Sequence, residues 1–518
     1  MLAMHDAAPL LHDYLSRSAS RLADKVALVC TKRRVTYREL EEDSNALAHA
    51  LIKSGVDRGD RVIVFADNTV EAVVSFWAAL KASAVVSVVN PATKADKLQF
   101  LIDDCRPAAL ITETRLRDTW FAPSRSSHLK SIIVTGERGE EKRWDPRLLS
   151  WNDALALGDR MPPARKCIDI DLAAIIYTSG STGDPKGVML SHRNMLTAAA
   201  SVAGYLEVKE DDVILNVLPL SFNYGLYQMI MAFRQGARLV LERSFAFPAQ
   251  TLRLMVDEGV TGFPGVPTIF AILAEMKSVK HHDLSPVRYV TNTAAPLPLK
   301  HIAALRQMFP RARIFSMYGL TECKRCTYLP PEDLDRKPAS VGIPIPNTEM
   351  WIVDENGRKA PPNTPGELVI RGATVMQGYW EKPEATAAVL RPGPLPGERV
   401  LYTGDCCRID DEGYLYFIGR MDDIIKSRGE KVAPKEIETV LFNIEGVKEA
   451  AVIGVPDAVL GQAVKAYVVL EKGASISAKD LQRQCSTKLE NFVVPKYIEF
   501  VSDLPKTATG KIRKAGLS

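Results

Sequence analysis

The chain has 518 residues, of which 46% are hydrophobic and 25% charged, and its formal net charge is +4 at pH 7. This length predicts roughly three or four folding units of about 150 residues, and the composition predicts ordered globular domains rather than disorder. The small net charge and the lack of long blocks of one sign argue against nucleic acid or an anionic membrane as a main partner.

Compartment and metal content are predicted from the N-terminus and the cysteines. The first 25 residues include His5, Asp6 and His12 and do not form a secretion signal. No run approaches the roughly 18 apolar residues of a membrane span, so we expect a cytoplasmic chain without an integral membrane segment. Eight scattered cysteines fit a reducing compartment. Cys323 and Cys326 form a single C-x-x-C, which supplies only two of the four ligands of a structural zinc, and we expect no metal there.

Strand-like apolar runs alternate with helical patterns through the first 340 residues. The predicted strands are 61–68, 84–90, 108–113, 173–180, 212–220, 237–243, 287–296 and 312–319. Residues 70–83 and 94–105 have helical patterns between the early strands. This alternation predicts parallel sheets covered by helices.

The pattern changes twice in the last third of the chain. Short strands with turn signals follow residue 340, at 350–359, 366–372 and 413–420, and predict a small sheet or barrel. Beyond Arg420, helices at 435–444 and 477–492 alternate with strands at 448–457 and 462–473. We therefore predict an α/β plus α+β protein: an N-terminal domain of doubly wound sheets over residues 1–420, with a barrel-like part at about 340–420, and a small C-terminal α+β domain over 421–518.

A glycine-rich stretch, YTSGSTGDPKGVMLSH at 177–192, lies between a predicted strand and a predicted helix. Its glycines and hydroxyl residues before the helix are Thr178, Ser179, Gly180, Ser181, Thr182, Gly183 and Gly187. Glycines allow close backbone approach, amides and hydroxyls donate hydrogen bonds, and Lys186 adds a positive charge, so the stretch predicts a phosphate-binding loop. It is not a P-loop, because Lys186 follows Pro185 and no Ser or Thr comes after it.

This stretch resembles the phosphate loop of the adenylate-forming superfamily, which contains acyl-CoA synthetases, peptide-synthetase adenylation domains and luciferases. Further motifs resemble that family in the same order: TNTAAPLP at 291–298, MYGLTE at 317–322, YTGD at 402–405, GRMDDIIKSRGEKVAPKEIE at 419–438 and LPKTATGKIRK at 504–514. Each motif is weak alone, but their order is specific. The chain is thus similar to AMP-dependent acyl-CoA synthetases and acyl–acyl-carrier-protein ligases.

The resemblance implies a reaction in two halves. A carboxylate attacks the α-phosphorus of ATP to give an acyl-AMP and pyrophosphate, and a thiol then attacks the acyl carbon and releases AMP. Lys511 is expected to bridge the carboxylate and the α-phosphate. Glu322 and Thr178 are expected to hold Mg²⁺, with Thr321 close by, and Thr178 and Lys186 complete the expected catalytic group.

The same resemblance implies the nucleotide site and the moving parts. The expected nucleotide-binding residues are Thr178, Ser179, Gly180, Ser181, Thr182, Gly183, Lys186, Thr293, Ala294, Ala295, Tyr318, Gly319, Thr321, Glu322, Asp405, Arg420 and Lys511. Asp405 would bind the ribose and Arg420 the ribose or a phosphate. Tyr318 would stack on adenine, with a role as a core tyrosine left open. Asp422 matches the hinge about which the C-terminal domain moves, and Gly429 matches the wall of the thiol tunnel.

The acid pocket is expected around Phe222, Asn223, Tyr224, Gly225, Val266 and Cys323. Amino-acid-activating relatives carry an aspartate at the place of Asn223, and an amide cannot neutralise an α-ammonium group. Asn223 either bonds a hydroxyl or amide of the substrate or caps a turn. Because the pocket residues are mostly apolar, they predict an aliphatic or aryl carboxylic acid rather than a charged one.

The resemblance implies ATP, Mg²⁺ and CoA as cofactors, with CoA the favoured acceptor. The alternative acceptor is the phosphopantetheine of a carrier protein acting in trans. A nucleotide-binding protein without catalysis is the second alternative. A dinucleotide oxidoreductase is excluded because the glycine fingerprint GxGxxG is missing.

Overall fold

The computed structural model describes residues 10–136, 145–178, 185–293, 297, 299–427, 430–457, 460–489, 493–506, 512–514 and 516–517. The chain divides into two compact units, which are described separately below. The first comprises Met1–Arg336, Pro344–Thr348 and Gly372–Leu390, and the second Lys337–Ile343, Glu349–Arg371 and Arg391–Ser518. Among the described residues no helix is long and apolar enough to cross a bilayer.

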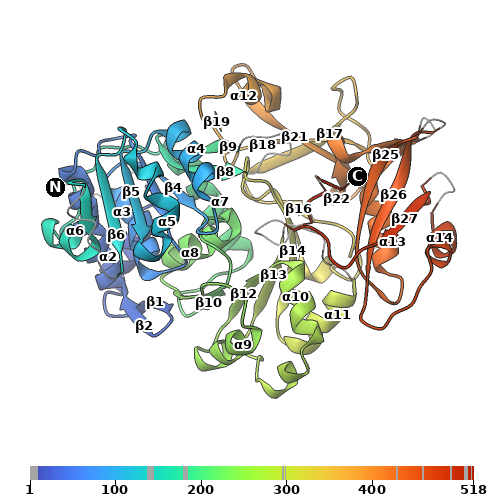
Figure 1. Cartoon of the computed structure of the whole chain (residues 1–518), viewed down its shortest axis with the longest axis horizontal. Coiled ribbons are helices and arrows are strands. Elements are labelled where there is room, and N and C mark those ends of the chain that lie inside the picture. The colour runs from blue at the N-terminus through green and yellow to red at the C-terminus, as the bar shows by residue number, and fades with distance from the viewer. Residues whose placement is uncertain are drawn as a thin grey trace. The chain divides into compact units, whose positions relative to one another are not determined.

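The first unit contains two large sheets (Figure 1). One has the strand order β19-β9-β8-β4-β3-β5-β6-β7. Its strands are β3 (Arg61–Phe65), β4 (Val85–Val89), β5 (Ala109–Glu113), β6 (Ser131–Thr135), β7 (Leu148–Ser150), β8 (Leu172–Thr178), β9 (Lys186–Ser191) and β19 (Gly378–Tyr379). The strands from β8 to β7 are parallel, whereas β9 and β19 are antiparallel to their neighbours.

The other large sheet has the order β16-β15-β14-β13-β12-β10-β11-β1-β2, where β16 is Ile343–Pro344. Its strands are β1 (Val26–Cys30), β2 (Arg33–Thr36), β10 (Val213–Asn216), β11 (Arg238–Leu241), β12 (Gly262–Gly265), β13 (Tyr289–Asn292), β14 (Arg313–Tyr318) and β15 (Thr327–Leu329). The strands from β14 to β1 are parallel, whereas β15 and β2 are antiparallel to β14 and β1, as expected of sheets built from βα repeats.

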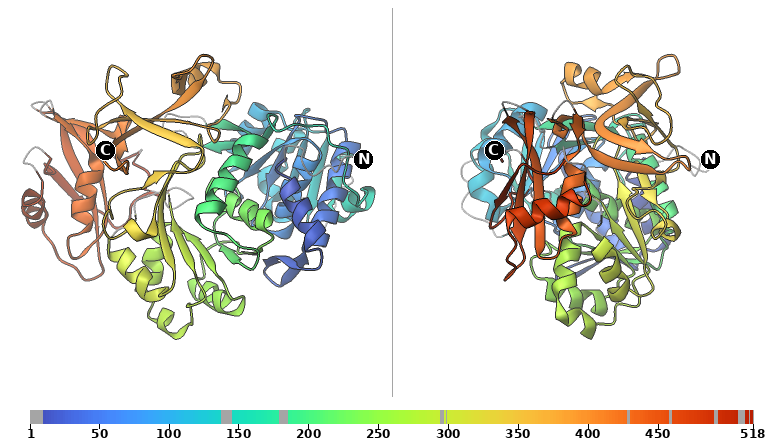
Figure 2. Two further views of the ribbon diagram at one scale, coloured as in Figure 1. Left: turned by 180° about the vertical axis from the view of Figure 1, so that it is seen from behind. Right: turned by 90° about the vertical axis from the view of Figure 1, so that its right-hand side faces the viewer.

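Helices lie between the two sheets and on their outer faces (Figures 1 and 2). They are α1 (Asp13–Arg21), α2 (Tyr37–Lys53), α3 (Val70–Lys81), α4 (Ala95–Cys105), α5 (Arg117–Trp120), α6 (Trp151–Leu157), α7 (His192–Tyr205), α8 (Asn223–Gln235), α9 (Pro248–Asp257), α10 (Pro267–Glu275), α11 (Leu299–Met308) and α12 (Pro383–Val389). The α3 helix packs on β3 and β4, and α8 packs on β10 and β11. Trp77 of α3 meets Phe233 of α8 with ring centroids 5.9 Å apart, so these two helices join the sheets.

The second unit contains two small sheets. One has the order β17-β18-β21-β20, with β22 paired to β21, and the other β24-β23-β26-β25, with β27 paired to β26. The elements are β17 (Thr348–Val353), β18 (Gly366–Gly372), β20 (Leu390–Pro392), β21 (Arg399–Ile409), β22 (Leu415–Arg420), β23 (Ile425–Ser427), β24 (Glu430–Val432), α13 (Pro434–Phe442), β25 (Val447–Asp457), β26 (Gly461–Leu470), α14 (Ala478–Ser486) and β27 (Tyr497–Phe500). The second sheet has a separate apolar core that includes Ile437, Val452 and Leu481.

The predicted fold class is confirmed by these sheets, because parallel strands alternate with helices in the first unit and a smaller α+β module ends the chain. One local feature differs from the prediction. Residues 186–191, within the glycine-rich stretch that was interpreted as a loop, form the strand β9, whose buried Val188 and Leu190 pair with β8. The helix α7 begins where it was expected, after Ser191, which forms a capping box with Asn194.

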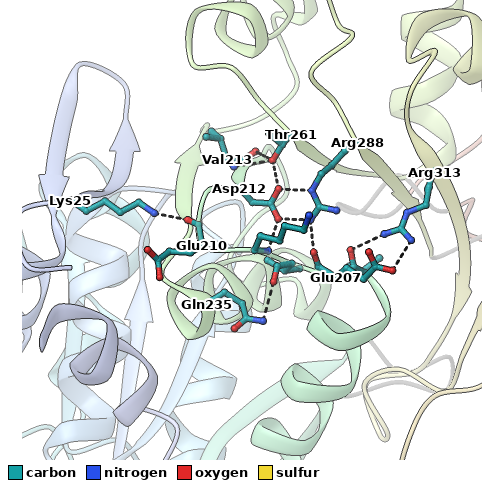
Figure 3. A network of polar contacts seen from close by, with 12 residues as sticks. Lys25, Glu207, Glu210, Asp212, Val213, Gln235, Thr261, Arg288 and Arg313 are labelled. Atoms are coloured by element: carbon teal, nitrogen blue, oxygen red, sulfur yellow. Dashed lines mark hydrogen bonds and ion pairs between the residues drawn. The ribbon is translucent and has the colours of Figure 1, made fainter. Parts of the chain in front are cut away.

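A buried polar network joins the amino ends of four neighbouring parallel strands (Figure 3). Asp212 precedes β10, Thr261 precedes β12 and Arg288 precedes β13. Asp212 accepts hydrogen bonds of 2.7 Å from both Arg288 Nε and Thr261 Oγ1. Arg313, at the start of β14, reaches the same loop by bonding Glu207 at 2.9 Å. The network therefore fixes one edge of the sheet, and the residues after the carboxyl ends of these strands lie at the opposite edge.

We expect Asp212→Ala to lower the free energy of unfolding by about 3–5 kcal/mol, because it leaves the Arg288 guanidinium without its partner. Burial alone would raise the pKa of Asp212, but hydrogen bonds led by those from Arg288 hold the pKa below its ordinary value. A lowered folded-state pKa stabilises the fold above the unfolded-state pKa of about 3.9, and this contribution is lost as the pH falls through the folded-state pKa. The difference between variant and wild type should therefore shrink below about pH 4.

Urea unfolding of both proteins between pH 3 and 7 measures this difference. Glu207→Ala is the matched control, since Glu207 pairs with Arg313 with 59% of its side chain exposed and should contribute under about 1 kcal/mol. Equal effects of the two substitutions would contradict a stabilising role for the buried pair.

Candidate nucleotide and acid site

The ends of the glycine-rich loop are held by a β-hairpin. Thr178, the last residue of β8, pairs with Lys186, the first residue of β9, and its Oγ1 donates to the Lys186 carbonyl at 3.5 Å. A Cβ at Gly187 would come within 2.7 Å of Ile175 Cγ2, so this position requires glycine. The loop residues between them, Ser179, Gly180, Ser181, Thr182 and Gly183, lie outside the described residues.

An edge strand links this hairpin to the expected magnesium ligand. Tyr379 of β19 pairs with Val188 of β9, and its hydroxyl donates to Glu322 Oε1 at 2.8 Å. Lys186 Nζ lies 5.3 Å from the centroid of the Tyr379 ring. Tyr379 therefore connects Glu322, from one motif, with Lys186 and its strand partner Thr178, from another. Tyr379 was not predicted from the sequence, where the short motif Gly-Tyr-Trp at 378–380 was its only signal.

The second group of expected nucleotide residues lies at the carboxyl ends of β13 and β14. These strands are parallel neighbours, with Asn292 opposite Ser316, so buried Thr293 and half-buried Tyr318 lie at the same edge of the sheet. A Cβ at Gly319 would lie 2.5 Å from the Lys324 carbonyl oxygen, so the turn that leads to Thr321 and Glu322 requires glycine. Ala294 and Ala295 lie outside the described residues.

Four of the expected acid-pocket residues form the start and first turn of α8. Phe222 precedes the helix, Asn223 begins it, and Tyr224 is buried, donating from its hydroxyl to the Thr291 carbonyl of β13 at 2.9 Å. A Cβ at Gly225 would lie 2.4 Å from the Pro219 carbonyl oxygen. The helix start is thereby fixed against the strand that leads to Thr293.

Two further pocket residues follow strands β12 and β14, which lie on either side of β13. Val266 is buried directly before α10, after β12, and Cys323 is fully buried directly after Glu322. Cys323 and Cys326 are both free thiols, and burial raises the pKa of Cys326 well above its ordinary value. Among the described residues no group of three or more His, Cys, Asp or Glu side chains could hold a metal ion.

Two charged residues in the same loop were missed by the sequence analysis. Lys324 and Arg325 follow Cys323 and are 5% and 3% exposed. In the sequence they belong to ECKRC, which was interpreted only for its cysteines. A pattern of residues along the sequence does not show that both side chains are buried beside the start of α8.

The second unit holds the expected ribose residues as an ion pair. Asp405 of β21 lies opposite Arg420 of β22, and Arg420 Nη1 donates to Asp405 Oδ1 at 2.8 Å. Gly404 precedes Asp405 with a φ of +67°, a conformation that favours glycine. A carboxylate has about four acceptor positions, so Asp405 can accept from Arg420 and from other donors together.

The expected hinge residue lies directly beyond this pair. Asp422 belongs to a short 3-10 helix, Met421–Asp423, between β22 and β23, and its side chain is outside the described residues. Gly429 and Lys511 also lie outside them.

Comparisons with known proteins identify the class that this fold and these residues define. Residues 15–380 match the family model described as AMP-binding enzyme, and residues 436–511 match the model of the AMP-binding enzyme C-terminal domain. The chain belongs to this family, the adenylate-forming superfamily, and is an AMP-forming acid–thiol ligase of the acyl-CoA synthetase type.

Individual relatives cover nearly the whole chain. A long-chain-fatty-acid–CoA ligase of Bacillus subtilis (strain 168) is 32% identical over 535 residues, covering 98% of this chain and 94% of the relative. The ATP-bound crystal structure of MatB from Rhodopseudomonas palustris is 30% identical with a TM-score of 0.88 and covers 98% of each chain. The anthranilate CoA ligase AuaEII in complex with anthranoyl-AMP is 29% identical with a TM-score of 0.89, covering 97% of this chain and 95% of that one.

The contact between Tyr379 and Glu322 generates a kinetic prediction. Tyr379→Phe keeps the ring beside Lys186 but removes the hydrogen bond to the carboxylate, so the KM for ATP should rise about tenfold or more. This corresponds to roughly 1.5 kcal/mol for a hydrogen bond to a charged group. Pyrophosphate release at varied ATP and fixed Mg²⁺ measures it. The control is Tyr416→Phe, which removes a comparable bond to Asp410 outside the expected site, and kinetic constants equal to wild type in Tyr379→Phe would contradict the role.

Proposed function

We propose that this ligase joins a carboxylic acid to CoA through an acyl-AMP intermediate. In the first half-reaction a carboxylate oxygen bonds to the α-phosphorus of ATP and the bond to pyrophosphate breaks. In the second, the CoA sulfur bonds to the acyl carbon and AMP leaves. The observation that carries the proposal is the convergence of Thr178, Lys186 and Glu322 around Tyr379, in a chain whose family forms acyl-adenylates.

The first half-reaction brings two anions together, so charge neutralisation and positioning are the main demands on the protein. We assign Lys186 and the loop between Thr178 and Lys186 to the phosphates. Glu322 suits Mg²⁺, because it is a half-buried carboxylate held in place at one oxygen by Tyr379, and Mg²⁺ prefers one or two carboxylates plus phosphate oxygens. When bound, the ion would supply charge neutralisation on the phosphates, and Thr178 would lie next to it.

The remaining nucleotide contacts are assigned from the two units separately. Tyr318 and Thr293, at one edge of their sheet, would border the adenine together with Ala294 and Ala295. Asp405, oriented by Arg420, would accept hydrogen bonds from the ribose hydroxyls. Lys511, from the C-terminal module, would supply the positive charge between the two reacting anions.

CoA is the proposed acceptor because the relatives described above include a fatty-acid–CoA ligase and an anthranilate CoA ligase. A carrier-protein phosphopantetheine presents the same thiol arm and is the alternative acceptor. We further propose that the domain boundary lies at residues 420–421, with Asp422 as the hinge and Gly429 beside the thiol arm.

A substrate panel tests the proposed function. Pyrophosphate release should be detected with ATP, Mg²⁺ and at least one acid from a series of fatty, aryl, dicarboxylic and amino acids. Adding CoA should convert that acid to a thioester with one AMP released per thioester. Adenylation without any CoA product would favour the carrier-protein acceptor, and no release with any acid would favour a nucleotide-binding protein without catalysis.

Two substitutions should separate the half-reactions. Lys511→Ala should slow acyl-AMP formation at least roughly 10²–10³-fold, as is typical of losing one preorganised electrostatic group, while thioester formation from supplied acyl-AMP continues. Gly429→Leu should do the reverse, because a side chain would obstruct the thiol arm. Single-turnover assays of each half-reaction measure this, and loss of the same half in both variants would refute the two-conformation account.

A further inference from the structure

Two buried cations lie side by side at the expected acid pocket. Lys324 Nζ donates to the Asn223 carbonyl at 2.8 Å and lies 4.0 Å from the centroid of the Tyr227 ring. The Arg325 guanidinium lies over the Tyr224 ring, 5.1 Å from its centroid. Their surroundings are thus the first two turns of α8, which begins at Asn223.

No carboxylate neutralises either charge within the described part of the chain. Lys324 and Arg325 form no ion pair with any residue that the structure describes, and the Arg325 Nε has no hydrogen-bond partner there. Aromatic faces attract cations, but they replace a counter-ion only in part.

Another deeply buried lysine of this chain shows the ordinary arrangement. Lys81 is 4% exposed, and its ammonium lies 2.7 Å from a carboxylate oxygen of Glu41 while also donating to Ser44 and Asn45. Since an unpaired buried charge is costly, such compensation is the rule for charges that serve the fold. Neither Lys324 nor Arg325 has such a compensating carboxylate among the described residues.

Other polar atoms at the same place also lack partners. Asn223 Oδ1 and Gln228 Oε1, both on α8, are buried without a hydrogen bond to any described residue. Lys324 itself has a φ of +57°, an unusual conformation for a residue with a side chain, which costs of order 1 kcal/mol and is concentrated at functional sites. Uncompensated charge, unsatisfied polar atoms and backbone strain therefore coincide in one small region.

The position of this region relates it to the acid substrate. Lys324 is two residues beyond Glu322, the expected magnesium ligand, and so lies within about 7 Å of it along the chain. Asn223 and Tyr224, which contact these two side chains, belong to the residues expected to form the acid pocket. A short substrate whose carboxylate reacts beside the nucleotide would have its far end near Lys324 and Arg325.

We propose that the substrate is a short acid with a second anionic group, such as a dicarboxylic acid, and that Lys324 and Arg325 bind this second group. The inference rests on the proposed function and names its substrate class. The planar Arg325 fork suits a carboxylate, and Lys324 can exchange its bond to the Asn223 carbonyl for a charge-assisted bond to the substrate. This replaces the prediction of an uncharged acid body, which took no account of the two cations.

Matched acid pairs test the inference. Pyrophosphate release is measured with linear dicarboxylic acids of three to six carbons and with the monocarboxylic acids in which a methyl group replaces the distal carboxylate. The best dicarboxylic acid should exceed its matched partner at least about 100-fold in kcat/KM, because a site built for a polar group strongly rejects the analogue without it. Lys324→Met and Arg325→Met should each reduce this ratio at least about tenfold, mainly by lowering kcat/KM for the dicarboxylic acid.

Lys81→Met is the matched control, a buried lysine with an internal partner. It should lower the Tm without changing the ratio, whereas Lys324→Met should keep or raise the Tm. A preference for monocarboxylic acids in the wild type, or a ratio unchanged in both pocket variants, would overturn the inference while leaving the proposed ligase activity intact. Absence of pyrophosphate release with every acid would instead overturn the proposed function and the inference with it.

Discussion

The pairing of β9 with two different strands is the constraint on which the expected catalytic groups depend. On one side β9 pairs with β8, which sets Thr178 opposite Lys186, and on the other it pairs with β19, which sets Tyr379 beside them. Because Tyr379 then bonds Glu322, the end of β14 in the other sheet is connected to the same place. Two strand pairings and one side-chain hydrogen bond thus bring together groups from three distant parts of the sequence without requiring long-range ion pairs.

The rest of the first unit keeps these strands in register. Parallel strands place their carboxyl ends along one edge, and the residues expected to bind nucleotide follow these ends. The Asp212, Thr261 and Arg288 network fixes the opposite edge, so stabilising charges and expected catalytic charges are separated by the length of the strands. At that distance the Asp212 carboxylate, which stabilises the sheet, does not compete with an anionic substrate for the expected catalytic cations.

Much of this arrangement was predictable from local sequence, for physical reasons. Apolar periodicity predicted the parallel strands and covering helices, and Ser191 predicted the cap of α7 because capping is a local hydrogen bond. The strand β9 was not predicted and its residues were interpreted as loop, because the partner of Val188 and Leu190 is β8, on the other side of a glycine-rich loop. Tyr379 was missed because its role depends on strand pairing between segments nearly two hundred residues apart.

Lys324 and Arg325 illustrate a different limit. A charged pair in a loop is ordinarily solvated, and only packing reveals that α8 covers both side chains. Elsewhere the chain compensates its buried charges internally, as in Lys81 with Glu41 and Asp405 with Arg420. A cation that is compensated within the fold contributes to stability with or without ligand, whereas one that lacks a counter-ion gains its stabilising partner only from a bound anion. Since leaving such charges unpaired costs stability, their presence beside the expected acid pocket is best explained by selection among substrates rather than by folding.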